Sequence, residues 1–125
     1  MATHNVLVIV GSLRKQAFSL RVAHALAKVA PASLKLDIVT PEGLSWFNQD
    51  IEANPPADWV AFREKIQKHD GVIFVTPEYN HAYTGDLKLM IDAVHAEWQI
   101  KPIAFVSYGG ISGGLRAVEQ LRLVF

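Results

Sequence analysis

Four short apolar runs alternate along the chain with stretches whose apolar residues recur at helical spacing. The runs at residues 5–10 and 71–76 contain no charge and are rich in β-branched residues, as in strands that helices cover on both faces. In the run at residues 34–38, Leu34, Leu36 and Ile38 alternate with polar neighbours, which is typical of a half-buried edge strand. A fourth run follows at residues 103–107. This order of strands and helices predicts an α/β fold with a parallel sheet and right-handed crossovers.

The helical stretches have recognisable ends. Pro31 closes the first helix, and Asp58 is expected to cap a second helix that runs through His69. The positions expected to face the core are Val22, Ala23, Leu26 and Val29 in the first helix, Trp59, Phe62 and Ile66 in the second, Leu87, Met90, Ile91 and Val94 in the third, and Leu115, Val118, Leu121 and Leu123 in the last.

The first strand-to-helix loop, residues 11–19, carries the residue types of a phosphate site. It offers hydroxyls from Ser12 and Ser19, the guanidinium of Arg14, and free backbone N–H groups at a helix start. It matches neither the G-x-G-x-x-G nor the Walker A pattern. The alternative for this loop alone is an N-cap serine beside a solvated arginine.

Two more loops are expected at the same edge of the sheet, where open α/β sheets bind ligands. Residues 77–81 place polar groups beside aromatic ones, as a flat heterocycle requires; otherwise Tyr79 covers the core, and Asn80 and His81 form a turn. Residues 108–114 include four glycines, so the backbone can approach a ligand closely. The alternative for this third loop is an ordinary flexible turn.

Composition narrows the class of protein. The 125 residues suit a single domain, and 12 basic residues balance 12 acidic ones, so no positive field favours nucleic acid or an anionic membrane. The chain has no cysteine, which excludes disulfides, thiolate metal sites and a cysteine nucleophile. The first apolar run is too short to span a bilayer. We therefore expect a cytoplasmic protein that acts on small molecules.

The order and spacing of these motifs resemble the NAD(P)H-dependent FMN reductases with a flavodoxin-like fold, which include quinone, azo-dye and chromate reductases. The resemblance extends along essentially the whole chain. It depends on residues 11–14 (Gly-Ser-Leu-Arg), 47–51 (Phe-Asn-Gln-Asp-Ile), 77–80 (Pro-Glu-Tyr-Asn) and 107–110 (Ser-Tyr-Gly-Gly). It implies a three-layer sandwich with strand order 2-1-3-4-5, of which residues 1–125 contain four strands.

The resemblance also implies a bound FMN. Its phosphate would lie on Ser12, Arg14 and Ser19, and its isoalloxazine ring between the second and third loops. The ring-binding residues that the resemblance implies are Pro77, Glu78, Tyr79, Asn80 and His81 in the second loop, with Ser107, Gly109 and Gly110 in the third.

In such a protein the flavin carries the chemistry, and the side chains position it. NAD(P)H would deliver hydride to the flavin, and electrons would then pass to a quinone, azo, metal-oxyanion or free flavin acceptor. We therefore expect no catalytic acid or base, and we place His81 at the rim of the site. The other histidines lack metal-ligand spacing, so no metal site is expected. Members of the family are usually homodimers or homotetramers.

The end of the sequence differs from the family pattern, because members usually continue through another strand and a final helix. Without a fifth strand, the run at residues 103–107 would be an edge with unpaired backbone groups. We expect either that another subunit covers this edge or that the natural chain is longer than residues 1–125.

Two other functions remain open at this point. Residues 110–114 match the G-x-S-x-G motif of serine hydrolases, with Ser112 as the nucleophile, but no Asp or His follows Ser112 to complete a triad. The other alternative is a flavin-binding electron carrier or binding module without turnover.

Overall fold

A computed structural model describes residues 2–125 and contains one parallel four-stranded sheet. The strands are β1 (His4–Val10), β2 (Leu34–Val39), β3 (Gly71–Pro77) and β4 (Ile103–Tyr108), in the order β2-β1-β3-β4. This confirms the order expected from the flavodoxin-like resemblance. Within the described residues β4 pairs only with β3, so its outer edge is unpaired.

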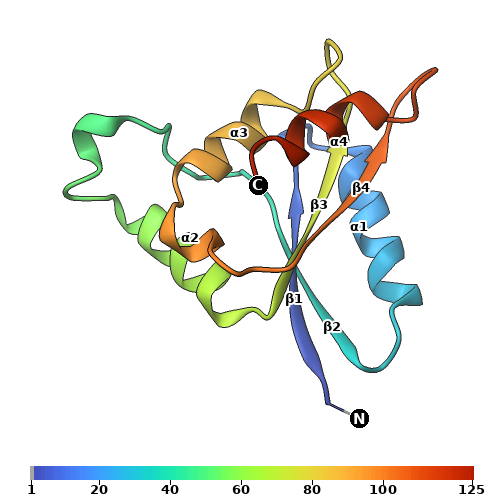
Figure 1. The fold of residues 1–125 in the computed structure, drawn as a ribbon, viewed down its shortest axis with the longest axis horizontal. Coiled ribbons are helices and arrows are strands. Elements are labelled where there is room, and N and C mark those ends of the chain that lie inside the picture. Colours follow the sequence, from blue (N-terminus) through green and yellow to red (C-terminus); the bar gives the residue numbers. More distant parts are fainter. Residues whose placement is uncertain (1) are drawn as a thin grey trace.

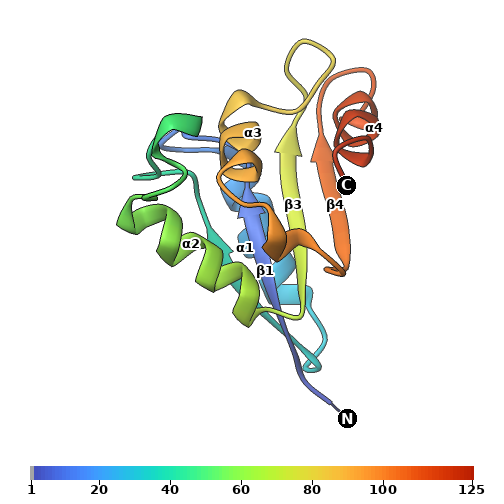
Figure 2. The ribbon, with the colours of Figure 1, turned by 60° about the vertical axis from the view of Figure 1, so that its left-hand side comes forward.

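Helices cover both faces of the sheet and complete three layers (Figure 1). Helix α1 (Phe18–Val29) lies on one face. Helices α2 (Ala57–Lys68), α3 (Gly85–Asp92) and α4 (Leu115–Arg122) lie on the other, and Figure 2 shows α4 beside β4. Two short 3₁₀ turns, Gln49–Ile51 and Ala96–Trp98, interrupt the connections. No helix within residues 2–125 is both long and apolar enough to cross a membrane.

Alternation along the central strands divides the core into two clusters. In β1, Leu7 and Ile9 face α2 and α3, whereas Val8 and Val10 face α1. All four are fully buried, as the uncharged run predicts. Strand β3 continues both clusters, with Phe74 on the side of α2 and α3 and Val75 on the side of α1.

The ends of the helices differ from the sequence prediction in particular ways. Asp58 lies inside the first turn of α2, whose N-cap is Pro56; its carboxylate accepts hydrogen bonds from the backbone N–H and hydroxyl of Ser45. These bonds, chiefly the one from the Ser45 backbone, lower the pKa of Asp58. Asp58 therefore ties the segment after β2 to α2 and does not cap the helix.

Three expected core positions are exposed. Val29 is exposed because the 3.6-residue period places the partly buried positions at Leu26 and at the C-cap residue Ala30, on either side of Val29. Helix α4 buries Ala117 and Leu121, one turn apart, so Leu115 and Leu123 lie outside that stripe. The apolar pattern thus predicted each helix correctly but not the full extent of its buried face.

Candidate functional site

Three loops meet at the carboxyl edge of the sheet. The pairs Val10↔Val75 and Pro77↔Tyr108 align the ends of β1, β3 and β4. The hydroxyl of Thr84 donates a hydrogen bond of 2.7 Å to the carbonyl of Gly11, and so links the end of the second loop to the first. The predicted convergence of the loops that follow these three strands is confirmed.

The first loop frames a small cavity. Ser12 is buried, and its hydroxyl accepts a bond of 3.3 Å from the backbone N–H of Arg14, whereas the Arg14 side chain is exposed. The cavity has a volume of about 250 Å³. Its lining residues are Ser12, Leu13, Arg14, Lys15, Ala17, Leu20, Thr40 and Glu42. A cation and a serine from the same loop thus border one space.

The start of α1 beside this cavity carries unused hydrogen-bonding groups. No side chain caps the helix at Ala17, and its first turn contains no acidic residue. Ser19, expected in the loop, is the second residue of α1; its hydroxyl is fully buried and has no partner among the described residues. Buried polar groups are normally paired, and helix N-termini favour anions. These residues therefore fit a phosphate group.

The second loop contains a tight turn. Tyr79 and Ala82 exchange two backbone hydrogen bonds of 2.9 and 3.0 Å, and the two residues between them, Asn80 and His81, have φ values of 50° and 64°. Positive φ at both central positions defines a type I′ hairpin turn. The alternative of a turn at Asn80 and His81 is thus confirmed, whereas Tyr79 is 49% exposed and does not cover the core. Tyr79 and His81 stand in solvent at the tip.

Glu78 connects the second loop to the third. Its backbone N–H donates to the Tyr108 carbonyl at 3.1 Å. Its carboxylate accepts bonds from the hydroxyl of Ser112 at 2.6 Å and from the backbone N–H of Arg116 at 3.1 Å. The Ser112 bond is the main reason why the pKa of Glu78 is lowered. Because the pKa falls on folding, this carboxylate stabilises the folded chain at pH values above its unfolded pKa. That stabilisation is lost as the pH falls through the folded pKa.

The third loop is built from glycines that serve different purposes. Gly114 has φ 87°, and a β-carbon there would lie 2.6 Å from the Ser107 β-carbon. Gly109 packs against Glu78 and the Gly114 backbone, whereas nothing lies within 4 Å of a β-carbon built on Gly110. The packing of the chain itself therefore requires glycine at position 114. At position 110 it does not, because the space around Gly110 is open.

Sequence reasoning missed two residues that hold the loops together. Thr84 caps α3 by accepting a bond from the Leu87 backbone N–H at 3.2 Å, besides its bond to Gly11. A threonine three residues before the first apolar position of a predicted helix was the available signal. Phe18, at the start of α1, packs edge-on against Tyr108 with ring centroids 4.9 Å apart. No local pattern indicates that contact.

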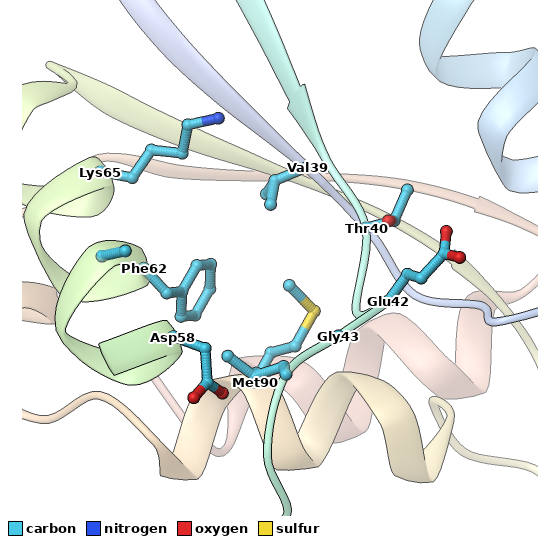
Figure 3. Close-up of a pocket in the computed structure, with 10 residues that line it drawn as sticks. Val39, Thr40, Glu42, Gly43, Asp58, Phe62, Lys65 and Met90 are labelled. Carbon is cyan, nitrogen blue, oxygen red and sulfur yellow. The ribbon is translucent and has the colours of Figure 1, made fainter. Parts of the chain in front are cut away.

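A second cavity, of about 300 Å³, lies between α2 and the segment after β2. Figure 3 shows Phe62 and Met90 pointing towards Val39 in this space. Thr40 and Glu42 line both this cavity and the one beside the first loop, so the two are neighbours. None of the residues predicted from the sequence to bind a ligand lines it.

Comparison with known protein families matches residues 4–125 to the family described as NADPH-dependent FMN reductase. The chain belongs to this family.

Several relatives of this family member are named enzymes. A quinone reductase of Pseudomonas putida is 45% identical over 98% of this chain and 70% of that protein. An NADPH:quinone oxidoreductase of Arabidopsis thaliana is 37% identical over 91% of this chain and 62% of that protein. The solved structure of FerB, a flavoenzyme NAD(P)H:(acceptor) oxidoreductase from Paracoccus denitrificans, matches with a TM-score of 0.90 and 30% identity, covering 97% of this chain and 70% of that one.

Proposed function

We propose that this protein is an FMN-dependent oxidoreductase that takes hydride from NAD(P)H and passes electrons to a quinone. The observation that carries the proposal is the uncapped start of α1, which adjoins a cavity lined by Ser12 and Arg14 and whose first turn contains the buried, unpartnered Ser19 hydroxyl. An FMN phosphate would supply the missing acceptors. The names of relatives such as the quinone reductase at 45% identity support the choice of a quinone over an azo, metal-oxyanion or free flavin acceptor.

In this proposal the protein binds and orients the flavin, and the flavin, when bound, supplies the hydride and electron transfer. Ser12, Arg14, Ser19 and the first amides of α1 hold the phosphate. The second and third loops border the ring, and the exposed Tyr79 and His81 shape its rim. The residues proposed to border the ring are Pro77, Glu78, Tyr79, Asn80, His81, Ser107, Gly109 and Gly110.

Absorbance spectroscopy tests this function directly. Purified protein mixed with FMN and then desalted is expected to retain flavin absorbance bands. NAD(P)H under argon should bleach them, and a benzoquinone should restore them. Steady-state NAD(P)H oxidation with quinone separates this enzyme from an electron carrier without turnover. Protein that retains no FMN, or retained FMN that NAD(P)H leaves oxidised, would contradict the proposal.

Replacing Ser19 with alanine is expected to affect apoprotein stability and FMN affinity in opposite directions. The apoprotein should be as stable as the wild type or up to about 1 kcal/mol more stable, because the change removes a buried hydroxyl without a partner. FMN binding should weaken by up to about tenfold, the value of one hydrogen bond. Thermal melting of the apoprotein and fluorescence titration with FMN measure the two effects. A large loss of apoprotein stability would show that Ser19 has a structural role instead.

A serine hydrolase is not supported. The hydroxyl of Ser112 donates to the Glu78 carboxylate at 2.6 Å, whereas the serine of a Ser-His-Asp triad donates to a histidine. Labelling of Ser112 by a fluorophosphonate probe would reverse this conclusion.

We also propose that residues 2–125 form one domain, that the protein is a homodimer or homotetramer, and that it works in the cytoplasm. The unpaired outer edge of β4 and the exposed Trp46 offer surface for a second subunit. The lack of cysteine agrees with a reducing compartment. Light scattering should give a mass of at least two chains, and a stable monomer of 13.8 kDa would contradict the oligomer.

A further inference from the structure

Two sequence motifs that lie 34 positions apart meet at one carboxylate. Glu78 comes from the Pro-Glu-Tyr-Asn motif after β3, and Ser112 is the serine of the G-x-S-x-G motif after β4. The Ser112 hydroxyl and the Arg116 backbone N–H both donate to the same oxygen of Glu78, Oε2. The side chain of Glu78 is only 8% exposed. A shielded carboxylate that accepts two well-placed donors forms stronger bonds than a neutral acceptor in solvent does.

The third loop needs such a restraint. Residues 109–114 contain four glycines, and β-carbons built on Gly110 and Gly113 would meet nothing within 4 Å. Ile111 is fully exposed and packs against nothing that could hold the loop. Glycine loses the most conformational freedom when its backbone is ordered, so this loop is costly to hold in one shape. Two side-chain hydrogen bonds reach this loop in the described chain: the Ser107 hydroxyl of β4 donates to the Gly113 carbonyl at 3.1 Å, and the Ser112 hydroxyl ties the loop to Glu78 of the second loop.

The neighbouring contacts show where the restraint acts. Gly109 lies against the β-carbon of Glu78, and the Glu78 backbone N–H bonds to the Tyr108 carbonyl. The Arg116 guanidinium approaches the other carboxylate oxygen at 3.4 Å but is about half exposed, so it adds little. Glu78 thus binds the third loop at both ends: its backbone N–H bonds to Tyr108 at the start, and its carboxylate to Ser112 and Arg116 at the end.

We propose that Glu78 and Ser112 form a clamp that holds the third loop in the shape that receives the flavin ring, so that both are positioning residues. The inference rests on the proposed function, and it gives the serine of the G-x-S-x-G motif a purpose other than nucleophilic attack. A loop ordered before binding loses less entropy when the ligand arrives. The clamp therefore favours FMN affinity without any need for Glu78 or Ser112 to touch the reacting atoms.

The test compares Ser112→Ala, Glu78→Ala and their double variant with the wild type. Ser112→Thr keeps the hydroxyl and serves as the rescue, and Glu119→Gln removes an exposed carboxylate of α4 as the matched control. Amide hydrogen exchange of residues 110–116 is measured in the apoprotein, and FMN affinity by fluorescence titration. Exchange reports on the loop itself, whether or not flavin binds.

We expect Ser112→Ala and Glu78→Ala to speed exchange at residues 110–116 and to weaken FMN binding, each by about tenfold. In the double variant, the exchange rates and the FMN affinity should equal those of Glu78→Ala, because both changes break the same hydrogen bond between Ser112 and Glu78. Ser112→Thr and Glu119→Gln should match the wild type. Exchange rates and FMN affinity that stay unchanged in Ser112→Ala would overturn the clamp. If the wild type itself does not bind FMN, the proposed function fails, and the exchange rates alone then support or overturn the clamp.

Discussion

Replacing Gly114 with alanine is expected to destabilise the protein by about 3 kcal/mol and to lower its melting temperature by roughly 10 °C. Two costs add at this position. The backbone has φ 87°, a conformation that disfavours any β-carbon, and the new carbon would lie 2.6 Å from the Ser107 β-carbon and 2.8 Å from the Tyr108 backbone nitrogen. Neither neighbour is a flexible side-chain end, so the backbone of the third loop must move. Thermal melting measures the loss.

Gly110→Ala is the matched control for this prediction. Both glycines belong to the third loop, but a β-carbon at 110 meets no atom within 4 Å and needs no left-handed conformation. We expect its stability to change by less than about 1 kcal/mol. If both variants melt at the same temperature, the loop has another conformation around Gly114. Because the clamp residues adjoin this loop, Gly114→Ala should also weaken FMN binding, whereas Gly110→Ala reports on direct contact with the ring.

Replacing Arg14 with alanine is expected to weaken FMN binding by about 10- to 100-fold, which corresponds to the 1.5–3 kcal/mol of a charged hydrogen bond. Arg14 lines the cavity beside the uncapped start of α1, and its guanidinium can bind two phosphate oxygens at once. Its side chain is exposed, so melting of the apoprotein should be unchanged. Fluorescence titration at two salt concentrations measures the affinity and its ionic part.

Lys15→Ala is the control for Arg14→Ala. Lys15 carries the same charge and lines the same cavity, but it is a flexible point charge without the planar fork of arginine. We expect its replacement to weaken FMN binding by less than about threefold. Equal losses for the two variants would show that the phosphate responds only to the general positive charge of the loop, and the role proposed for Arg14 would then be wrong.

Several features could be predicted from the sequence because they are local. Each strand follows from an apolar run of the right length, and parallel strands put their following loops at one edge of the sheet. The helical periodicity located α1 to α4, and it failed only at ends, as at Val29 and Leu115, where the stripe turns away from the sheet. Asp58 was assigned to a cap because its residue type suits one, but the helix already begins at Ala57, and the Asp58 carboxylate accepts hydrogen bonds from Ser45.

The sequence by itself determined the order of the elements, the strand order by family resemblance, and the three loops whose residues suit a flavin. Only the tertiary structure decided which polar groups of those loops are used and which remain free. Thr84 bonds to Gly11 across 73 positions and Ser112 bonds to Glu78 across 34, while the Ser19 hydroxyl is buried without a partner. The physical reason is that periodicity records how one element faces the core, whereas a hydrogen bond between distant side chains exists only after separate elements have packed.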